Sequence, residues 1–200
     1  MKYFLVLLLM TGLNCYGQDY KSQIDSFRKQ YTNDFLTDPS SPLKKDDLQY
    51  LRFYDADSTY RVIAKVEILI NEPVFIMPVF AGNGRQYARY AILKFILKGN
   101  PVQLTIYKNI ALVKQPQYSD YLFLPFTDET NGNTTYGGGR YIDMRMGDFK
   151  NNTVVIDFNK AYNPYCAFSG GYSCPKPPDE NNLKLAVEAG EKLFAGAKKH

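Results

Sequence analysis

The sequence contains a single histidine, His200, and this scarcity restricts the chemistry available to the chain. A structural zinc site normally takes four Cys or His ligands, and a nucleophilic cysteine needs a neighbouring base such as His. We therefore expect no metal site and no cysteine-based catalysis. The sequence also indicates no cofactor.

Runs of like charge and long apolar runs are missing as well. The formal charge of +4 arises from cations and anions mixed along the chain, so the composition does not require a nucleic-acid partner. The apolar run at residues 4–10 is shorter than the roughly 20 residues that cross a bilayer. We expect neither a nucleic-acid partner nor a transmembrane segment in the mature protein, and the sequence leaves the oligomeric state open.

The amino end has the pattern of a signal peptide. Lys2 supplies a positive charge, residues 4–10 form a short apolar region, and Cys15-Tyr16-Gly17 precedes the expected cut. Residues 1–17 are then a signal peptide, and a periplasmic or secreted protein begins at Gln18. Lipidation of Cys15 is the alternative, but Asn14 occupies a position where lipoprotein processing prefers a small residue.

Two cysteines remain after this cleavage, Cys166 and Cys174. Disulfides persist in exported proteins, and the short loop between these residues carries glycines that let it turn. We predict a disulfide, with two free structural thiols as the alternative.

The hydrophobic periodicity predicts one β-rich domain over residues 18–200, of the mainly β (α+β) class. Aromatic and aliphatic residues recur at helical spacing over residues 20–35, and an amino-terminal helix should dock this stripe. Alternating patterns predict strands at residues 59–70, 74–80, 87–97, 102–113, 121–126, 140–146 and 153–158. Because short polar turns separate these strands, we expect an antiparallel meander forming a sandwich or an open barrel.

A second helix is predicted at the carboxy end. Asp179 follows two prolines as an N-cap, and Leu183, Val187, Gly190 and Phe194 form its buried stripe.

Two polar segments are candidate ligand sites. Asp157 and Asn159 leave a strand on one side, and Asn163 follows shortly after; an Asx-rich turn that satisfies its own backbone is the alternative. In the second segment, residues 131–140, which includes Tyr136, glycines could let a ligand approach the backbone and Arg140 could bind an anion. A wide hairpin with a paired Arg140 is the alternative there.

The remaining aromatic and acidic residues give weaker signals. The 17 tyrosines and 13 phenylalanines could stack on sugars, but their strand and helix positions favour core packing. Two carboxylates could form a pair for glycoside hydrolysis, and the candidates are Asp128, Glu129, Asp143 and Asp157. The sequence does not give the distances between these carboxylates, so it gives such a pair little support.

Several of these segments resemble the bacterial domain-of-unknown-function family 1684. The resemblance is carried by residues 122–128, 130–132, 135–141, 156–159, 161–167, 174–178, 182–183 and 189–192, with shorter matches at residues 27–28 and 41–43. It implies one signature region that contains Arg140, Asp157, Asn159, Asn163, Cys166, Cys174 and Glu191. It implies no activity, because the family has none assigned.

The leading hypothesis is an exported, non-catalytic binding or envelope-associated protein that recognises a small polar or anionic ligand. Its candidate site combines Arg140, Asp157, Asn159, Asn163, Tyr136 and Glu191. One alternative is a hydrolase with Asp157 as the base, Arg140 as an electrostatic stabiliser, and Asn159 or Asn163 orienting water. Another is a purely structural protein with no pocket.

Overall fold

The computed structural model describes the backbone of residues 9–199 and the side chains of residues 19–199. Lys2 and most of the apolar region of the predicted signal peptide lie outside the described residues, so the signal peptide stays a prediction. No helix in the described part of the chain is both long and apolar enough to cross a membrane.

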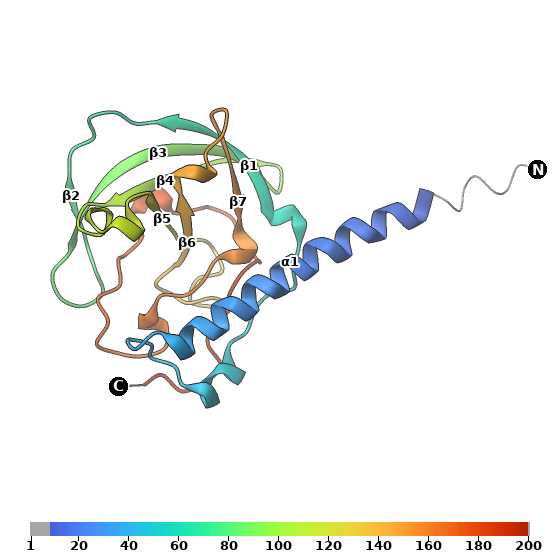
Figure 1. Ribbon diagram of the computed structural model, residues 1–200, viewed down its shortest axis with the longest axis horizontal. Helices are drawn as coiled ribbons and strands as arrows, with labels where there is room; N and C mark the ends of the chain where they lie inside the picture. Colours follow the sequence, from blue (N-terminus) through green and yellow to red (C-terminus); the bar gives the residue numbers. More distant parts are fainter. Residues whose placement is uncertain (1–8, 200) are drawn as a thin grey trace, which may run out of the picture.

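One long helix, α1 (Leu9–Thr37), precedes the sheet. Its amino-terminal end extends beyond the body of the protein, and its carboxy-terminal part lies along it (Figure 1). Ile24 and Phe35 of the predicted stripe are buried, and the aromatic residues between them are half-buried. The helix ends just before Asp38-Pro39, as the proline predicts. The predicted amino-terminal helix is confirmed.

The rest of the fold is one antiparallel sheet that curls into a half-barrel. Its seven strands are β1 (Arg61–Ile68), β2 (Phe75–Met77), β3 (Arg85–Leu97), β4 (Asn100–Asn109), β5 (Tyr121–Phe126), β6 (Arg140–Arg145) and β7 (Thr153–Asp157). The strand order is β6-β5-β4-β3-β1-β7, with β2 on the free part of β3. The predicted mainly β class and antiparallel pairing are confirmed, and of the two predicted arrangements the sheet forms the open barrel.

The strand order departs from a simple meander at its edges. Strands β3 to β6 follow one another, whereas β7 crosses to the opposite edge and pairs with β1. Strand β2 is shorter than predicted because Pro73 and Pro78 flank it, and proline cannot donate a ladder hydrogen bond.

Short 3-10 helices connect the strands. In the described residues they are η1 (Lys45–Tyr50), η2 (Ser58–Tyr60), η3 (Leu112–Lys114), η4 (Pro116–Tyr118), η5 (Met146–Asp148), η6 (Phe158–Lys160), η7 (Tyr165–Ala167) and η8 (Asp179–Asn181). Among them, η6 and η7 bring the chain from β7 to the side of the sheet that α1 occupies (Figure 1).

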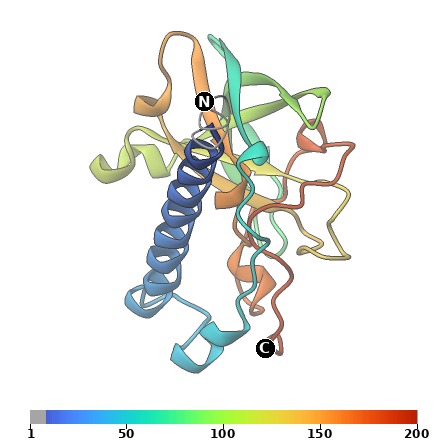
Figure 2. The ribbon, with the colours of Figure 1, turned by 90° about the vertical axis from the view of Figure 1, so that its right-hand side faces the viewer.

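The predicted carboxy-terminal helix is wrong. After η8, residues 182–199, which we call the C-terminal segment, form no helix and run along other segments of the chain. Most of this segment and α1 lie on different flanks of the molecule (Figure 2). Its backbone hydrogen bonds go to distant partners, as when the Glu191 amide donates to the Ala161 carbonyl at 2.8 Å.

The reason lies in a periodicity of two. Leu183, Val187 and Ala189 are buried and Leu185 is half-buried, while the residues between them are exposed. This alternation belongs to an extended chain that covers the sheet. Gly190 has a φ of +77°, and a Cβ there would lie 2.6 Å from the Ala161 carbonyl oxygen, so the backbones approach too closely for a side chain.

The main core lies between the concave face of the half-barrel and the C-terminal segment. It contains apolar residues of every long strand together with Leu183, Val187 and Ala189. Strands β5 and β6 are also covered on their other face, where Phe123 and Tyr141 belong to a second aromatic cluster. These two strands therefore have a protein environment on both sides, which is where the candidate site forms.

Candidate functional site

A cavity of about 560 Å³ opens between α1, the outer faces of β5 and β6, and residues 160–175. Its wall is rich in aromatic side chains: Phe27, Tyr31, Phe35, Tyr87, Tyr121, Phe123, Tyr141, Tyr162, Tyr165 and Tyr172. Among the described residues, the acidic side chains that line it are those of Asp34, on the exposed side of α1, and Asp143, on β6. Ligand pockets typically have volumes of about 300–1,000 Å³ and mostly apolar walls.

The alternation of side chains along β6 directs Asp143 into this cavity. Tyr141 and Asp143 share the outer face of β6, while Ile142 and Met144 point into the main core. In the sheet register Asp143 lies opposite Phe123 of β5. The Tyr141 and Phe123 rings meet edge to face with their centroids 4.7 Å apart. Asp143 therefore stands beside a packed pair of rings.

The Asp143 carboxylate is held through one of its oxygens. Its Oδ1 accepts hydrogen bonds from the hydroxyls of Tyr121, at 2.7 Å, and Tyr162, at 2.6 Å. Its Oδ2 accepts no hydrogen bond from any residue that the structure describes. Asp143 also stays accessible to a water-sized molecule. One carboxylate oxygen is thus fixed by tyrosines and the other is available to a ligand.

The surrounding protein changes the acidity of these groups. The protein packed around the exposed Asp143 partly desolvates its carboxylate and raises its pKa. The two tyrosine hydrogen bonds and the charge of Arg145 oppose the rise because they stabilise the ionised carboxylate. Burial beside Asp143 holds the pKa of Tyr121 and of Tyr162 well above the ordinary value for a phenol. Both tyrosines therefore remain protonated and keep donating to the carboxylate.

The cation whose charge acts on Asp143 is already engaged in other contacts. Arg145 lies on the same face of β6, but its guanidinium forms an ion pair with Asp120 at 2.7 Å and donates to the Gln117 carbonyl at 3.0 Å. No described cation lies within ion-pair distance of Asp143. Its charge is stabilised by the two tyrosine hydrogen bonds and, at longer range, by Arg145, without a direct ion pair.

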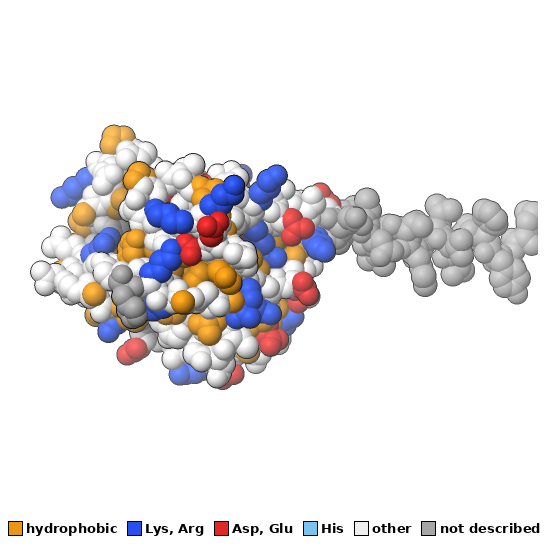
Figure 3. Space-filling view, turned by 90° about the horizontal axis from the view of Figure 1, so that it is seen from below, with side chains coloured by type: hydrophobic (Ala, Val, Ile, Leu, Met, Phe, Trp, Pro, Cys, Tyr) orange, Lys and Arg blue, Asp and Glu red, His pale blue; other side chains and the backbone are white. Residues whose placement is uncertain are grey.

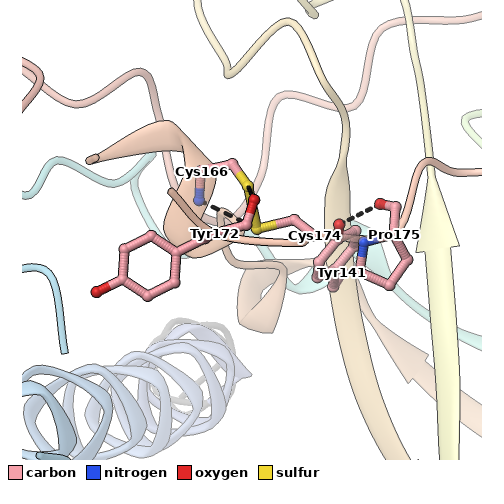
Figure 4. The surroundings of a disulfide bond; sticks show 5 residues. All are labelled: Tyr141, Cys166, Tyr172, Cys174 and Pro175. Carbon is pink, nitrogen blue, oxygen red and sulfur yellow. Dashed lines mark hydrogen bonds between the residues drawn. A yellow bond between two sulfur atoms is a disulfide. The ribbon is translucent and has the colours of Figure 1, made fainter. Parts of the chain in front are cut away.

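A disulfide between Cys166 and Cys174 shapes the wall opposite the sheet, so the predicted disulfide is present. The Cα atoms lie 6.2 Å apart, and the Cys166 amide donates to the Cys174 Sγ at 3.2 Å. Figure 4 shows Tyr141 reaching from β6 to the Pro175 carbonyl beside the bridge. The bridge and this hydrogen bond fix residues 172–175, which line the cavity.

Arg140 lies on the other face of β6 and is fully buried. Its guanidinium forms an ion pair with Asp128 at 2.8 Å and donates to the Val187 carbonyl at 2.8 Å and to the Ala189 carbonyl. It sits over the ring of Phe126 at 5.3 Å. Arg140 thus ties the C-terminal segment to the sheet.

Asp157 and Asn159 meet at a second place, near the start of the docked part of α1. The Asp157 Oδ1 accepts from the Tyr20 hydroxyl at 2.9 Å and from the Asn159 amide at 3.1 Å. The Asn159 side chain also bridges to the backbone of Asp57. This is the Asx turn that the sequence offered as the alternative, extended by a contact to the helix.

Glu191 and Asn163 form a third group, which is completely buried. The Glu191 Oε2 accepts from the Tyr31 hydroxyl and the Asn163 amide, both at 2.8 Å. Burial raises the pKa of Glu191 to about 7. The Glu191 Oε1 and the Asn163 Oδ1 have no hydrogen-bond partner among the described residues.

Tyr136 is half-buried beside Phe80, with ring centroids 6.2 Å apart. The structure therefore distributes the six predicted site residues over several groups, of which two are joined by a hydrogen bond of 3.4 Å from the Arg140 guanidinium to the Glu191 carbonyl. None of the six lines the cavity. Their role in binding a ligand stays a prediction.

The sequence analysis named Asp143 only as one of four possible glycosidase carboxylates, and it did not select Tyr121 or Tyr162. One signal was available, because β5 reads Tyr-Leu-Phe-Leu-Pro-Phe and is apolar on both faces. A strand that is apolar on both faces must be covered twice. The tyrosine and aspartate of the neighbouring strand then face the second covered surface.

The described residues contain no group of three or more His, Cys, Asp or Glu side chains that could hold a metal ion. Charged side chains of both signs are interspersed over the face shown in Figure 3.

Comparison with known proteins identifies the family. The family described as protein of unknown function (DUF1684) matches residues 46–192. The solution NMR structure of an uncharacterised protein from Haloarcula marismortui is 31% identical, covers 88% of this chain and 95% of its own, and has a TM-score of 0.67. No curated protein matches the chain. The resemblance noted in the sequence is therefore confirmed, while the bacterial nature of the family stays a prediction. This chain belongs to the DUF1684 family.

Proposed function

We propose that this protein binds a small organic molecule in the cavity between α1 and strands β5 and β6. The observation that carries the proposal is the combination of about 560 Å³ of space, an aromatic wall and one partly unsatisfied carboxylate, Asp143. Aromatic walls with a few fixed polar groups are typical of ligand pockets.

The contacts of Arg140 argue against an anionic ligand at the site first predicted. An anion needs a free guanidinium, and that of Arg140 is buried in an ion pair with Asp128 and in carbonyl contacts. The same contacts weaken the hydrolase hypothesis, which needs Arg140 beside Asp157 in one cleft. These two residues belong to different hydrogen-bond groups.

A pair of matched tryptophan variants tests the proposal. Gln30 lines the cavity, while Gln23 lies two turns earlier on α1 and does not. Both are exposed and both donate to an aspartate four residues away, at 2.7 Å and 2.9 Å. Gln30→Trp should fill the cavity, and Gln23→Trp is the control for the size of the new side chain.

The measurement is a ligand-observed NMR screen of small aromatic compounds. We expect compounds that bind the natural protein and Gln23→Trp equally well, and that lose binding to Gln30→Trp. The chain contains no other tryptophan, so each variant also provides a fluorescent reporter at a known position. A screen without binders, or binding that Gln30→Trp leaves unchanged, would reject the proposal.

We also propose that the protein acts outside the cytoplasm. The short apolar region after Lys2 and the Cys166–Cys174 disulfide support this, because disulfides persist in oxidising compartments. The intact mass of the protein isolated from its own cells distinguishes the fates of the amino end. Export by signal cleavage predicts a chain that starts at Gln18, and a lipoprotein would start at an acylated Cys15. A full-length chain would contradict both.

A further inference from the structure

We infer that the ligand of this cavity is an organic cation, with an ammonium group at Asp143 and an apolar body among the aromatic rings. This inference rests on the proposed function and names its ligand class. It follows from the hydrogen bonding of Asp143, the rings beside it and the positions of the nearby charges.

The hydrogen bonding of Asp143 leaves a place for a donor. Both tyrosine hydroxyls donate to Oδ1, and Oδ2 receives nothing from the described residues. A carboxylate has about four acceptor positions, so an ammonium N–H can bind at Oδ2 without displacing a tyrosine. An anion at this position would meet the like charge of the carboxylate and be repelled.

The rings around Asp143 add to the preference for a cation. Tyr141 stands two residues before Asp143 on the same face of β6, and its ring meets that of Tyr162 at 90° with centroids 5.8 Å apart. The Tyr31 ring from α1 lies 5.9 Å from Tyr162. Aromatic faces attract cations through their quadrupole, and sites for ammonium ligands use several rings together. Strand, loop and helix each provide a ring here.

The charges near the cavity do not reverse this preference. Arg85 and Lys160 line it, but both are exposed, and neither pairs with Asp143. The Lys160 ammonium lies over the Phe27 ring at 5.4 Å. Arg145 is held by Asp120. Asp143 is therefore a negative charge that the described residues hydrogen bond but do not neutralise.

Three probes with one aromatic body test the inference: 2-phenylethylammonium, 2-phenylethanol and 3-phenylpropanoate. They differ in the charge of the end that would reach Asp143. Calorimetric or NMR titration of the purified protein should give an affinity for the ammonium compound at least about tenfold higher than for either other probe, as expected for a hydrogen bond to a charged group.

Charge-removing variants assign the preference to one carboxylate. Asp143→Asn keeps the shape of the side chain, and we expect a roughly tenfold to hundredfold loss of ammonium affinity with little change for 2-phenylethanol. Asp34→Asn tests the other acidic residue of the lining, and Asp46→Asn, an exposed residue of η1 outside the cavity, controls for net charge. Both should bind the ammonium probe like the natural protein.

The outcomes separate this inference from the proposed function. If 3-phenylpropanoate or 2-phenylethanol binds as tightly as the amine and Gln30→Trp removes that binding, the cavity is a ligand site but not for cations. If the ammonium preference follows Asp34 or survives Asp143→Asn, the assignment to Asp143 is wrong. If none of the probes and no compound of the screen binds, the proposed function itself fails.

Discussion

Arg140 and Asp143 stand three residues apart on β6, and their environments differ in an instructive way. Arg140 points into the core and is fully buried, with its charge paired and most of its donors used. Asp143 points to the opposite face, reaches a cavity and uses one oxygen only. A buried charge that the protein satisfies holds the fold together, whereas an exposed carboxylate with an unused oxygen beside a cavity can bind a ligand.

The largest effect on stability is expected from removing the buried charge of Arg140. Arg140→Met keeps the volume and leaves Asp128 buried without its cation, which should cost about 3–5 kcal/mol of unfolding free energy. Urea denaturation measures the loss. Arg145→Met on the same strand is the control, because its pair with Asp120 is exposed and worth about 0–1 kcal/mol. Similar small losses for both variants would contradict the structural role of Arg140.

Glu191 is as buried as Arg140, but one of its oxygens has no hydrogen-bond partner among the described residues. Its pKa of about 7 in the folded protein lies above the ordinary 4.5. Its contribution to stability is therefore fully present below about pH 4.5 and is lost as the pH rises through 7. The difference corresponds to about 3 kcal/mol.

Glu191→Gln should remove this pH dependence and make the protein more stable than the natural chain above pH 7. Unfolding free energies measured from pH 4 to pH 9 provide the test. Glu188→Gln, an exposed residue of the same segment, should leave the profile unchanged. A profile that Glu191→Gln does not flatten would show that Glu191 is not the titrating group.

The disulfide borders the same cavity as Asp143. Replacing both Cys166 and Cys174 with alanine should cost about 2 kcal/mol, near the lower end for a disulfide because the closed loop is short. The same variant should bind cavity ligands more weakly, since residues 172–175 form part of the wall. Equal affinity in the natural protein and the alanine variant would mean that this wall does not need the bridge.

Tyr162→Phe should have the smallest effect on stability, about 1 kcal/mol or less, because Asp143 keeps its hydrogen bond to Tyr121. Amine binding should weaken, but less than in Asp143→Asn. Tyr118→Phe is the control, since Tyr118 is half-buried outside the cavity and its hydroxyl has no described partner. A loss well above 1 kcal/mol would place Tyr162 with Arg140 as a residue that the fold requires.

Much of the fold was predictable from hydrophobic periodicity. The helix stripe of α1 and the alternation in the strands are local patterns, and both gave the right elements. The carboxy-terminal helix failed because Leu183 and Val187, four residues apart, fit either period. The inward-facing Leu185 and Ala189 distinguish the two, because they fit the two-residue period of an extended chain and not the period of a helix.

The candidate site was less accessible to sequence reasoning. The alternation of side chains along β6 places Arg140 on the same face as Ile142 and Met144, which already indicates that this arginine is buried. The same alternation places Asp143 and Tyr141 together on the opposite face. The local sequence pattern does not predict that α1 and residues 160–175 cover this second face. The cavity beside the tyrosines and Asp143 forms only through that long-range contact.

The most direct test of this account is a map of backbone amide chemical shifts on titration with 2-phenylethylammonium. We predict the largest changes at residues 121–123, 141–145 and 162–165, around Asp143. Changes concentrated at residues 128–130 and 187–191, around Arg140, would contradict the central claim that the open face of β6, and not its buried face, binds the ligand.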